Sequence, residues 1–390
     1  MSPAVLNPAD NPLSAEFYSL LAHNFGPALA PLMMAIGVTV VLVPPARYLS
    51  FRLGAVSEPG GRNINQKPVG RLGGIPLALG FLISAAVFAT HGHQTSVPVV
   101  TVLVAGALVI AIFTLDDIRP MRARTQFLLQ LAIALLVVGM GTSIQFVNLG
   151  VGKPLQLGLL AVPVTVVWLL GMQNTMNFLD GVDGLAAGVA AIVAAALMLA
   201  AVNRETQHPE QVTVVILSAC LIGACVGFLC FNFFPARVFM GGGAHFLGLT
   251  LGIISIFGIA KGAVVFALLV PVMALLIPIA DTALAILRRR RNRVSVAHPD
   301  TAHIHHQLLD FGLSQRQTCL VFYFATGITA CLGLMLFGHR KILAVAVVLL
   351  VVGLSTLVGE RLSELEDSQA GARAGRIDGE GPGTAALLES

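Results

Sequence analysis

The sequence predicts an all-α polytopic membrane protein with about eleven transmembrane helices. Of its 390 residues, 56% are hydrophobic and only 11% are charged, and the mean hydropathy is +0.87. Soluble domains usually carry about 25% charged residues. This composition excludes a soluble enzyme, a disordered chain and a fibrous protein. The third observation is that apolar runs of roughly 20 residues, the length that crosses a bilayer, recur along the chain.

The predicted spans are separated by polar or charged segments. They are residues 28–46, 73–90, 97–115, 127–144, 158–174, 184–202, 212–230, 246–260, 262–287, 318–337 and 342–358. The eighth is short, and the ninth contains Pro271 and Pro278, which should break or kink it because proline lacks a backbone donor. We expect residues 1–358 to form a single integral-membrane domain. The Gly- and Glu-rich residues 359–390 are predicted to be a disordered cytoplasmic tail.

The distribution of positive charge predicts the orientation. With eleven spans, 18 of the 23 Lys and Arg residues fall on one side of the membrane. Cytoplasmic loops carry the excess of positive charge, so the N-terminus should lie outside and the C-terminus in the cytoplasm. On the external side, residues 143–157 alternate apolar and polar side chains around Gly150 and Gly152, which predicts a small β-hairpin.

Two adjacent carboxylates, Asp116 and Asp117, end the third predicted span. Neighbouring carboxylates repel each other, which raises one pKa or requires a cation. The pair therefore suits a general base, a Mg²⁺ site, or both. The alternative is a solvated pair beside the arginines at positions 119, 122 and 124.

A second polar cluster follows the fifth predicted span. Asn174, Asn177, Asp180 and Asp183 recur every three residues, close enough to the helical period to share one face. Oxygen ligands of this kind suit Mg²⁺, which usually completes its coordination with water and substrate phosphates. The alternative is a polar loop with helix caps.

A third cluster, His303, His305 and His306, lies in a predicted cytoplasmic loop after the basic run 288–293. Zinc sites usually space their ligands differently. Imidazole and guanidinium groups both donate to phosphate, so the cluster indicates anion binding.

These clusters resemble a known family, the polyprenyl-phosphate N-acetylhexosamine-1-phosphate transferases. The resemblance extends from about residue 47 to about residue 313. It rests on the Asp116-Asp117 pair, on NTMNFLDGVDGLAAG at 174–188, on FNFFPARVFMG at 231–241 and on HIHH at 303–306. The HIHH sequence is similar to the UDP-GlcNAc:undecaprenyl-phosphate branch more than to the related phospho-MurNAc-pentapeptide translocase.

The resemblance implies transfer of an N-acetylhexosamine 1-phosphate, GlcNAc-1-phosphate in this branch, from a UDP-sugar to polyprenyl (undecaprenyl) phosphate, with release of UMP and with Mg²⁺ as cofactor. It implies the first membrane step of a cell-envelope glycan such as lipopolysaccharide, teichoic acid or exopolysaccharide. The enzyme would be a multi-pass protein of the cell (inner) membrane with a cytoplasmic active site, and it would form a homodimer.

The resemblance also implies roles for individual residues. Asp116, Asp117 and Asp180 would be catalytic, with the first two activating the acceptor phosphate. Asn177 would be a Mg²⁺ ligand. The nucleotide sugar would be bound by a larger set, in which Asp183 and Asn232 contact the uracil and the histidines hold the phosphate or sugar end: Asn174, Asp183, Asn232, His303, His305 and His306.

The chain departs from the family pattern at the metal site. The second Mg²⁺ carboxylate expected after Met240-Gly241 is replaced by Gly242, and the segment is one residue shorter. His245 is a candidate substitute, and an imidazole ligand suits Mn²⁺ better than Mg²⁺. Either the metal site is rebuilt around other oxygen ligands, or transfer is weakened or lost. If the rest of the site is intact, Gly242→Asp should raise Mg²⁺-dependent activity.

Three functions therefore stand open from the sequence. The first is the sugar-1-phosphate transferase. The second is a catalytically impaired homologue that binds nucleotide sugar or lipid phosphate as a regulatory or scaffold protein. The third is a transporter, which the absence of an internal repeat disfavours.

Overall fold

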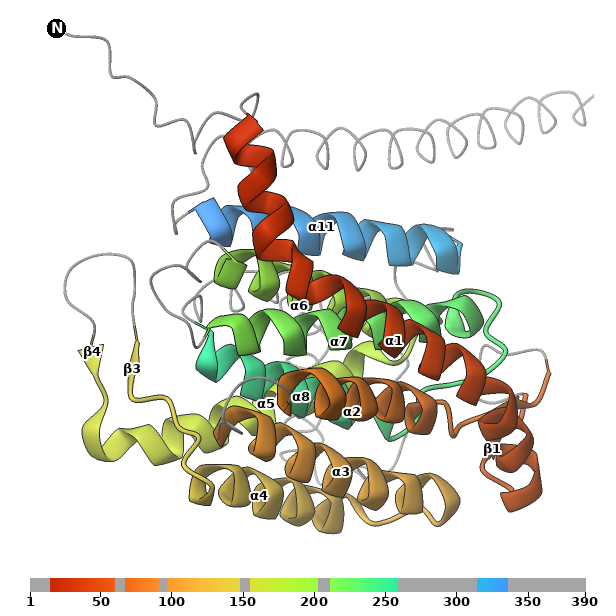
Figure 1. Cartoon of the computed structure of the whole chain (residues 1–390). Helices are drawn as coiled ribbons and strands as arrows, with labels where there is room; N and C mark the ends of the chain where they lie inside the picture. The colour runs from red at the N-terminus through yellow and green to blue at the C-terminus, as the bar shows by residue number, and fades with distance from the viewer. Residues whose placement is uncertain are drawn as a thin grey trace, which may run out of the picture.

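The computed structural model describes residues 15–59, 67–90, 97–147, 155–202, 211–258 and 314–335. These residues form a bundle of α-helices with two short sheets (Figure 1). The helices are α1 (Ala15–Leu53), α2 (Gly74–Thr90), α3 (Val97–Ile118), α4 (Ala123–Gly139), α5 (Ala161–Leu179), α6 (Leu185–Val202), α7 (Gln211–Asn232), α8 (Gly243–Phe257) and α11 (Gln315–Met335). Each overlaps one predicted span. The predicted spans 262–287 and 342–358 and the predicted tail lie outside the described residues.

The helices confirm a polytopic membrane protein. Six of those described are long and apolar enough to cross a membrane by length and composition: those at Gly26–Leu53, Val97–Ile118, Gly158–Leu179, Leu185–Val202, Gln211–Asn232 and Gln315–Met335. α2, α4 and α8 are apolar but shorter. The total of eleven spans and the orientation remain predictions.

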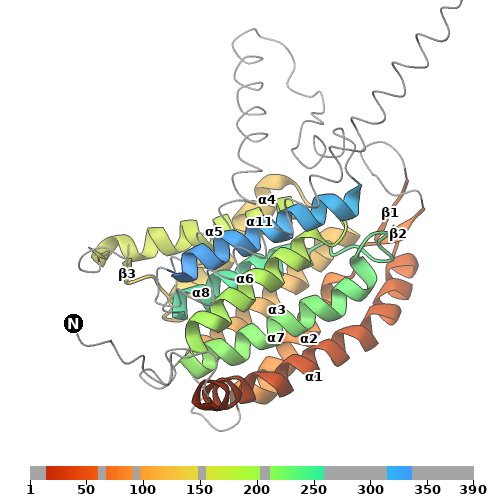
Figure 2. The ribbon, with the colours of Figure 1, turned by 90° about the horizontal axis from the view of Figure 1, so that it is seen from above.

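Helix α8 lies at the centre of the bundle. All of its residues except Phe257 are buried, and it packs against α2, α3, α5, α6 and α7 (Figure 2). A helix enclosed by other helices need not match the thickness of the bilayer, which explains why 15 residues suffice. The Phe246 ring of α8 packs edge-on against Phe81 of α2, with centroids 5.7 Å apart.

Small residues allow the outer helices to approach closely. Gly188 of α6 packs against the ring of Tyr323 in α11, and Gly223 of α7 packs against the backbone of α1 at Leu32. Such contacts are typical of membrane proteins, in which close van der Waals packing rather than the hydrophobic effect joins helices.

Two short antiparallel strand pairs complete the described fold. The predicted hairpin is confirmed as β3 (Phe146–Val147) and β4 (Leu155–Gln156), with Phe146 opposite Gln156. The second pair, β1 (Val56–Ser57) and β2 (Val69–Gly70), follows α1 and was not predicted. A further bridge joins Gly70 to Val238. This bridge brings the segment before α2 beside the segment before α8.

Candidate active site

The predicted site residues that the structure describes gather at one end of the bundle. Hydrogen bonds there connect the C-terminal ends of α1, α3 and α7 with the segments that precede α2, α4, α6 and α8. Tyr323 of α11 also bonds to Gly184 in this region. Residues that are distant in sequence therefore meet in one layer of loops and helix ends. The cluster 303–306 lies outside the described residues.

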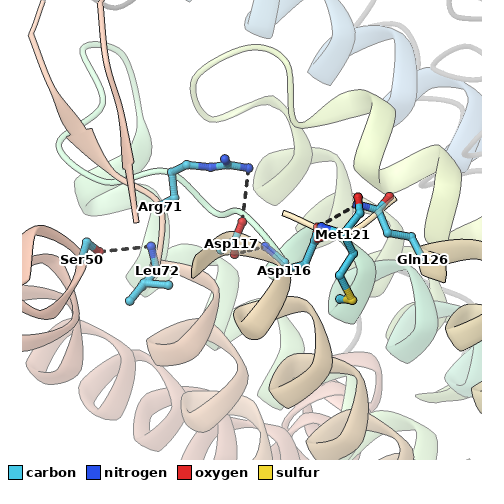
Figure 3. A network of polar contacts seen from close by, with 8 residues as sticks. Ser50, Arg71, Leu72, Asp116, Asp117, Met121 and Gln126 are labelled. Carbon is cyan, nitrogen blue, oxygen red and sulfur yellow. Dashed lines mark hydrogen bonds and ion pairs between the residues drawn. The ribbon is translucent and has the colours of Figure 1, made fainter. Parts of the chain in front are cut away.

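Asp117 is the buried carboxylate of this layer. Its Oδ2 accepts a hydrogen bond from the backbone N–H of Gly242 at 2.6 Å, and its Oδ1 lies 3.3 Å from Nη2 of Arg71 (Figure 3). The Asp117 side chain is 5% exposed, whereas that of Arg71 is 43% exposed. An amide and a guanidinium thus hold one carboxylate in a fixed orientation.

Asp116 points toward α4 and has different partners. Its Oδ1 accepts from the N–H of Met121 at 2.6 Å and its Oδ2 from Nε2 of Gln126 at 2.9 Å (Figure 3). These bonds fix the turn between α3 and α4. The two adjacent carboxylates are therefore not equivalent, because one binds the local turn and the other contacts two distant loops.

The glycines at 241–243 allow the turn before α8 to approach Asp117. Gly241 has φ +55°, and a β-carbon added there would collide with the Asp117 carboxylate. A β-carbon at Gly242 would lie 2.5 Å from Cβ and 2.6 Å from the backbone carbon of Phe113. The structure therefore leaves no room for the Gly242→Asp replacement that the family pattern suggests, since the backbone of α3 occupies that space.

Asn232 and Asp183 join the loop after α5 to the segment after α7. Asn232 accepts from the N–H of Gly184 at 3.0 Å and donates to the carbonyl of Val238 at 2.9 Å. Oδ2 of Asp183 accepts from the N–H of Ala236 at 2.9 Å. Gly184 adopts φ +85°, which glycine reaches without strain. These bonds hold the 180–184 loop rigidly between α5 and α6.

Asp180 follows the last residue of α5 and is partly buried. Burial and the charges of Asp117 and Asp183 raise its pKa well above the usual range, although Arg71 opposes this shift. Burial also raises the pKa of Asp183, while its bond to Ala236 lowers it. Clustered carboxylates that destabilise one another's charge are suited to binding a cation.

His245 lies in a buried polar network beneath this layer. Its ring stacks on Phe113 with centroids 3.9 Å apart, and its Nδ1 lies 3.3 Å from Nε2 of Gln130. The Oε1 of Gln130 accepts from Nδ2 of Asn174 at 2.9 Å. Gln130 must then donate to His245, which places the imidazole proton on Nε2. A ligand role for His245 would require this bond to break.

The oxygen ligands that the described residues offer can hold Mg²⁺ only if the substrate supplies further oxygens. No group of three or more His, Cys, Asp or Glu side chains is placed to hold a metal within the described ranges. The oxygen donors there are the coupled carboxylates of Asp117 and Asp180 and the exposed amide of Asn177. Mg²⁺ commonly binds through one or two carboxylates plus phosphates and water, so the set fits Mg²⁺.

Two site features were not assigned from the sequence. Arg71 contacts Asp117, and α11 closes the 180–184 loop through Tyr323, whose hydroxyl donates to the carbonyl of Gly184 at 2.6 Å. For the contact of Arg71 with Asp117, the sequence signal is a lone arginine between Gly70 and Gly73. The Tyr323 contact has no local sequence signal, because it depends on how α11 packs.

Comparisons with known proteins identify the family to which this chain is similar. Residues 99–259 match the profile described as Glycosyl transferase family 4. A probable undecaprenyl-phosphate N-acetylglucosaminyl 1-phosphate transferase of Bacillus subtilis (strain 168) is 34% identical, over 75% of this chain and 80% of the relative. A decaprenyl-phosphate N-acetylglucosaminephosphotransferase of Mycobacterium tuberculosis (strain ATCC 25618 / H37Rv) is 36% identical, over 87% of this chain and 92% of the relative. A phospho-N-acetylmuramoyl-pentapeptide-transferase of Acetivibrio thermocellus is 30% identical, over 60% of this chain and 74% of the relative.

Proposed function

Because this chain belongs to glycosyl transferase family 4, among the polyprenyl-phosphate N-acetylglucosamine-1-phosphate transferases, we propose that it transfers GlcNAc-1-phosphate from UDP-GlcNAc to a polyprenyl phosphate. An oxygen of the lipid phosphate attacks the phosphorus attached to the sugar. The bond between that phosphorus and the bridging oxygen of the diphosphate breaks, and UMP leaves. The product is a polyprenyl-diphospho-GlcNAc.

The position of Asp117 is the observation that supports this reaction most strongly. It is a buried carboxylate at the end of an apolar span, held by Gly242 and Arg71. A lipid phosphate can approach such a group from the bilayer while its isoprenoid chain remains among the helices. We propose that Asp117 accepts a proton from the attacking phosphate, and that Asp116 fixes the turn behind it.

The loop between α5 and α6 is the proposed nucleotide-sugar site. Asp183 uses Oδ2 to bind Ala236, which leaves Oδ1 for the uracil. Asn232 has one amide hydrogen left after its bond to Val238. Asn174 reaches the same region from α5 but is bonded to Gln130, so we propose that it supports the site through Gln130. His303, His305 and His306 are proposed to hold the phosphate or sugar end.

We further propose that Mg²⁺ binds beside the diphosphate, with Asp180 and Asn177 as its protein ligands. When bound, the metal would neutralise charge on the phosphate oxygens. Burial and, to a smaller extent, the neighbouring carboxylates raise the pKa of Asp180, and a cation there would offset both effects, which supports this site.

The finer topology is also part of the proposal. We infer eleven spans, an external N-terminus and a cytoplasmic C-terminus, which puts the described site on the cytoplasmic face of the cell (inner) membrane. The excess of Lys and Arg on that side supports the orientation. The protein is proposed to act as a homodimer in cell-wall or related glycan synthesis, such as that of lipopolysaccharide, teichoic acid or exopolysaccharide.

The test is UMP release by the detergent-purified protein. UDP-GlcNAc and undecaprenyl phosphate are supplied with Mg²⁺ or Mn²⁺ in separate reactions. We expect release that requires both the lipid and a metal, with Mg²⁺ preferred. UDP-GlcNAc binding without release under either metal would contradict the proposal and favour the binding-only homologue.

A further inference from the structure

We propose that Arg71 is a substrate-binding residue, which holds a phosphate oxygen of the lipid phosphate or of the nucleotide sugar beside Asp117. This inference rests on the proposed transferase function. Arg71 precedes α2, and its guanidinium lies 3.3 Å from the carboxylate at the end of α3. Among residues 69–74, it alone has a side chain that is not buried.

The backbone around Arg71 is fixed on both sides. The N–H of Arg71 donates to the carbonyl of Ala55 at 2.9 Å, and the N–H of Leu72 donates to the Ser50 hydroxyl at 3.2 Å (Figure 3). On the other side, the N–H of Phe239 donates to the carbonyl of Gly70 at 2.8 Å. α1 and the segment before α8 thus hold the arginine from opposite sides.

Close packing restricts this segment further. A β-carbon on Gly70 would lie 2.6 Å from Cβ of Ser50, and one on Gly73 would lie 2.6 Å from the carbonyl oxygen of Phe239. Neither glycine can be replaced without moving its neighbours. The position of Arg71 relative to Asp117 is therefore set by the fold rather than by a flexible loop.

The guanidinium has donors left for a ligand. It carries five N–H groups in a rigid planar arrangement that matches carboxylate and phosphate oxygens. The contact with Asp117 is made through Nη2 toward one oxygen, and 43% of the side chain remains exposed. An arginine that only neutralised a buried aspartate would be expected to be buried with it.

Because carboxylates surround Arg71, a phosphate can bind there only if a positively charged group contacts it directly. Asp117 and Asp180 both interact with Arg71, so the site already holds more carboxylates than this guanidinium neutralises. A phosphate arriving there needs a direct donor to overcome their repulsion. Arg71 supplies that donor at the carboxylate proposed to activate the acceptor, and can contact Asp117 and a phosphate oxygen together.

The test measures KM for each substrate in Arg71→Gln and Arg71→Lys, with Arg47→Gln as the matched control. Arg47 is an exposed arginine near the same end of α1 and its substitution changes the charge equally. We expect Arg71→Gln to raise KM at least tenfold for the substrate whose phosphate is held, and Arg71→Lys to recover part of the loss. Arg47→Gln should leave both KM values within twofold of the wild type. A higher KM for undecaprenyl phosphate would show that Arg71 binds the lipid phosphate, and a higher KM for UDP-GlcNAc would show that it binds the diphosphate. A higher KM for both substrates would show that Arg71 contacts both phosphates.

A fall in kcat with both KM values unchanged would overturn the inference, because Arg71 would then act only through Asp117. If the wild-type protein releases no UMP, the proposed function fails, but Arg71 can still be tested by direct binding. Equilibrium binding of UDP-GlcNAc and of undecaprenyl phosphate should then be at least tenfold weaker in Arg71→Gln for one of them. Unchanged binding of both would overturn the inference. Arg71→Lys keeps a cation beside Asp117 and serves if Arg71→Gln does not fold.

Discussion

The backbone N–H of Gly242 donates to Oδ2 of Asp117 across 2.6 Å, and thereby joins the turn before α8 to the end of α3. Where the family pattern has a carboxylate, this chain has a glycine whose amide binds a different carboxylate. The amide carries a partial positive charge and binds the Asp117 carboxylate directly, which fixes its orientation. Asp117 is thus positioned by the main chain on one side and by Arg71 on the other.

Asp117→Asn should abolish transfer. Loss of a general base typically costs about 10²–10⁴-fold in rate. The fold should survive, because an asparagine oxygen can still accept the bond from Gly242. The measurement is UMP release together with thermal unfolding in detergent. Wild-type turnover by this variant would remove Asp117 from the mechanism.

Gly242→Ala should destabilise the protein by about 1–3 kcal/mol, because the added methyl group meets the backbone of Phe113. Gly242→Asp should destabilise it at least as much and should give no gain in Mg²⁺-dependent transfer. Gly37→Ala is the control, since a β-carbon there meets nothing within 4 Å. Increased activity in Gly242→Asp would mean that the turn can rearrange to accept a carboxylate.

Asp180→Asn should stabilise the metal-free protein at neutral pH while it abolishes transfer. The folded protein binds the Asp180 proton more tightly than the unfolded chain does, because the pKa is raised on folding. Stability is therefore lost as the pH rises from the unfolded pKa of about 3.9 through the folded pKa. Asparagine carries no charge and avoids this loss.

The melting temperature, measured against pH with and without Mg²⁺, tests the Asp180 prediction. Mg²⁺ should raise the melting temperature of the wild type more than that of Asp180→Asn, because a ligand that binds the folded state stabilises it. A variant that melts below the wild type at neutral pH would show that the charged carboxylate is stabilising instead.

His245→Phe should cost about 1–3 kcal/mol of stability, because the Gln130 amide loses its acceptor while the stack on Phe113 is kept. Combined with Gln130→Leu, the losses should be less than additive, since both variants remove one interaction. The ratio of Mg²⁺- to Mn²⁺-supported transfer should not change. A shift in that ratio would indicate that His245 is a metal ligand.

His305→Ala should weaken substrate binding without unfolding the protein, if the histidine cluster binds phosphate. The measurements are the affinity for UDP-GlcNAc and the melting temperature of the same preparation. A large fall in melting temperature at unchanged affinity would instead assign His305 a structural role.

The sequence by itself determined the class of protein and the position of its helices. A run of about 20 apolar residues must form a helix in a bilayer, since its backbone has no other hydrogen-bonding partner there. The β3–β4 strand pair was also predictable, because its alternating residues and central glycines are local signals. The helix boundaries predicted from the sequence were less accurate. α1 continues to Leu53, past the apolar run, because backbone hydrogen bonds extend a helix into polar sequence.

Only the tertiary structure decided what the polar residues do. Asp116 and Asp117 are neighbours with the same chemistry, yet one binds the turn to α4 and the other binds Gly242 and Arg71. Asn174 belongs to the same sequence pattern as Asp180 and Asp183 but bonds to Gln130. Spacing along a helix fixes which face a side chain occupies. Its partner depends on which other helix packs there, and this is set by long-range contacts that no local pattern encodes.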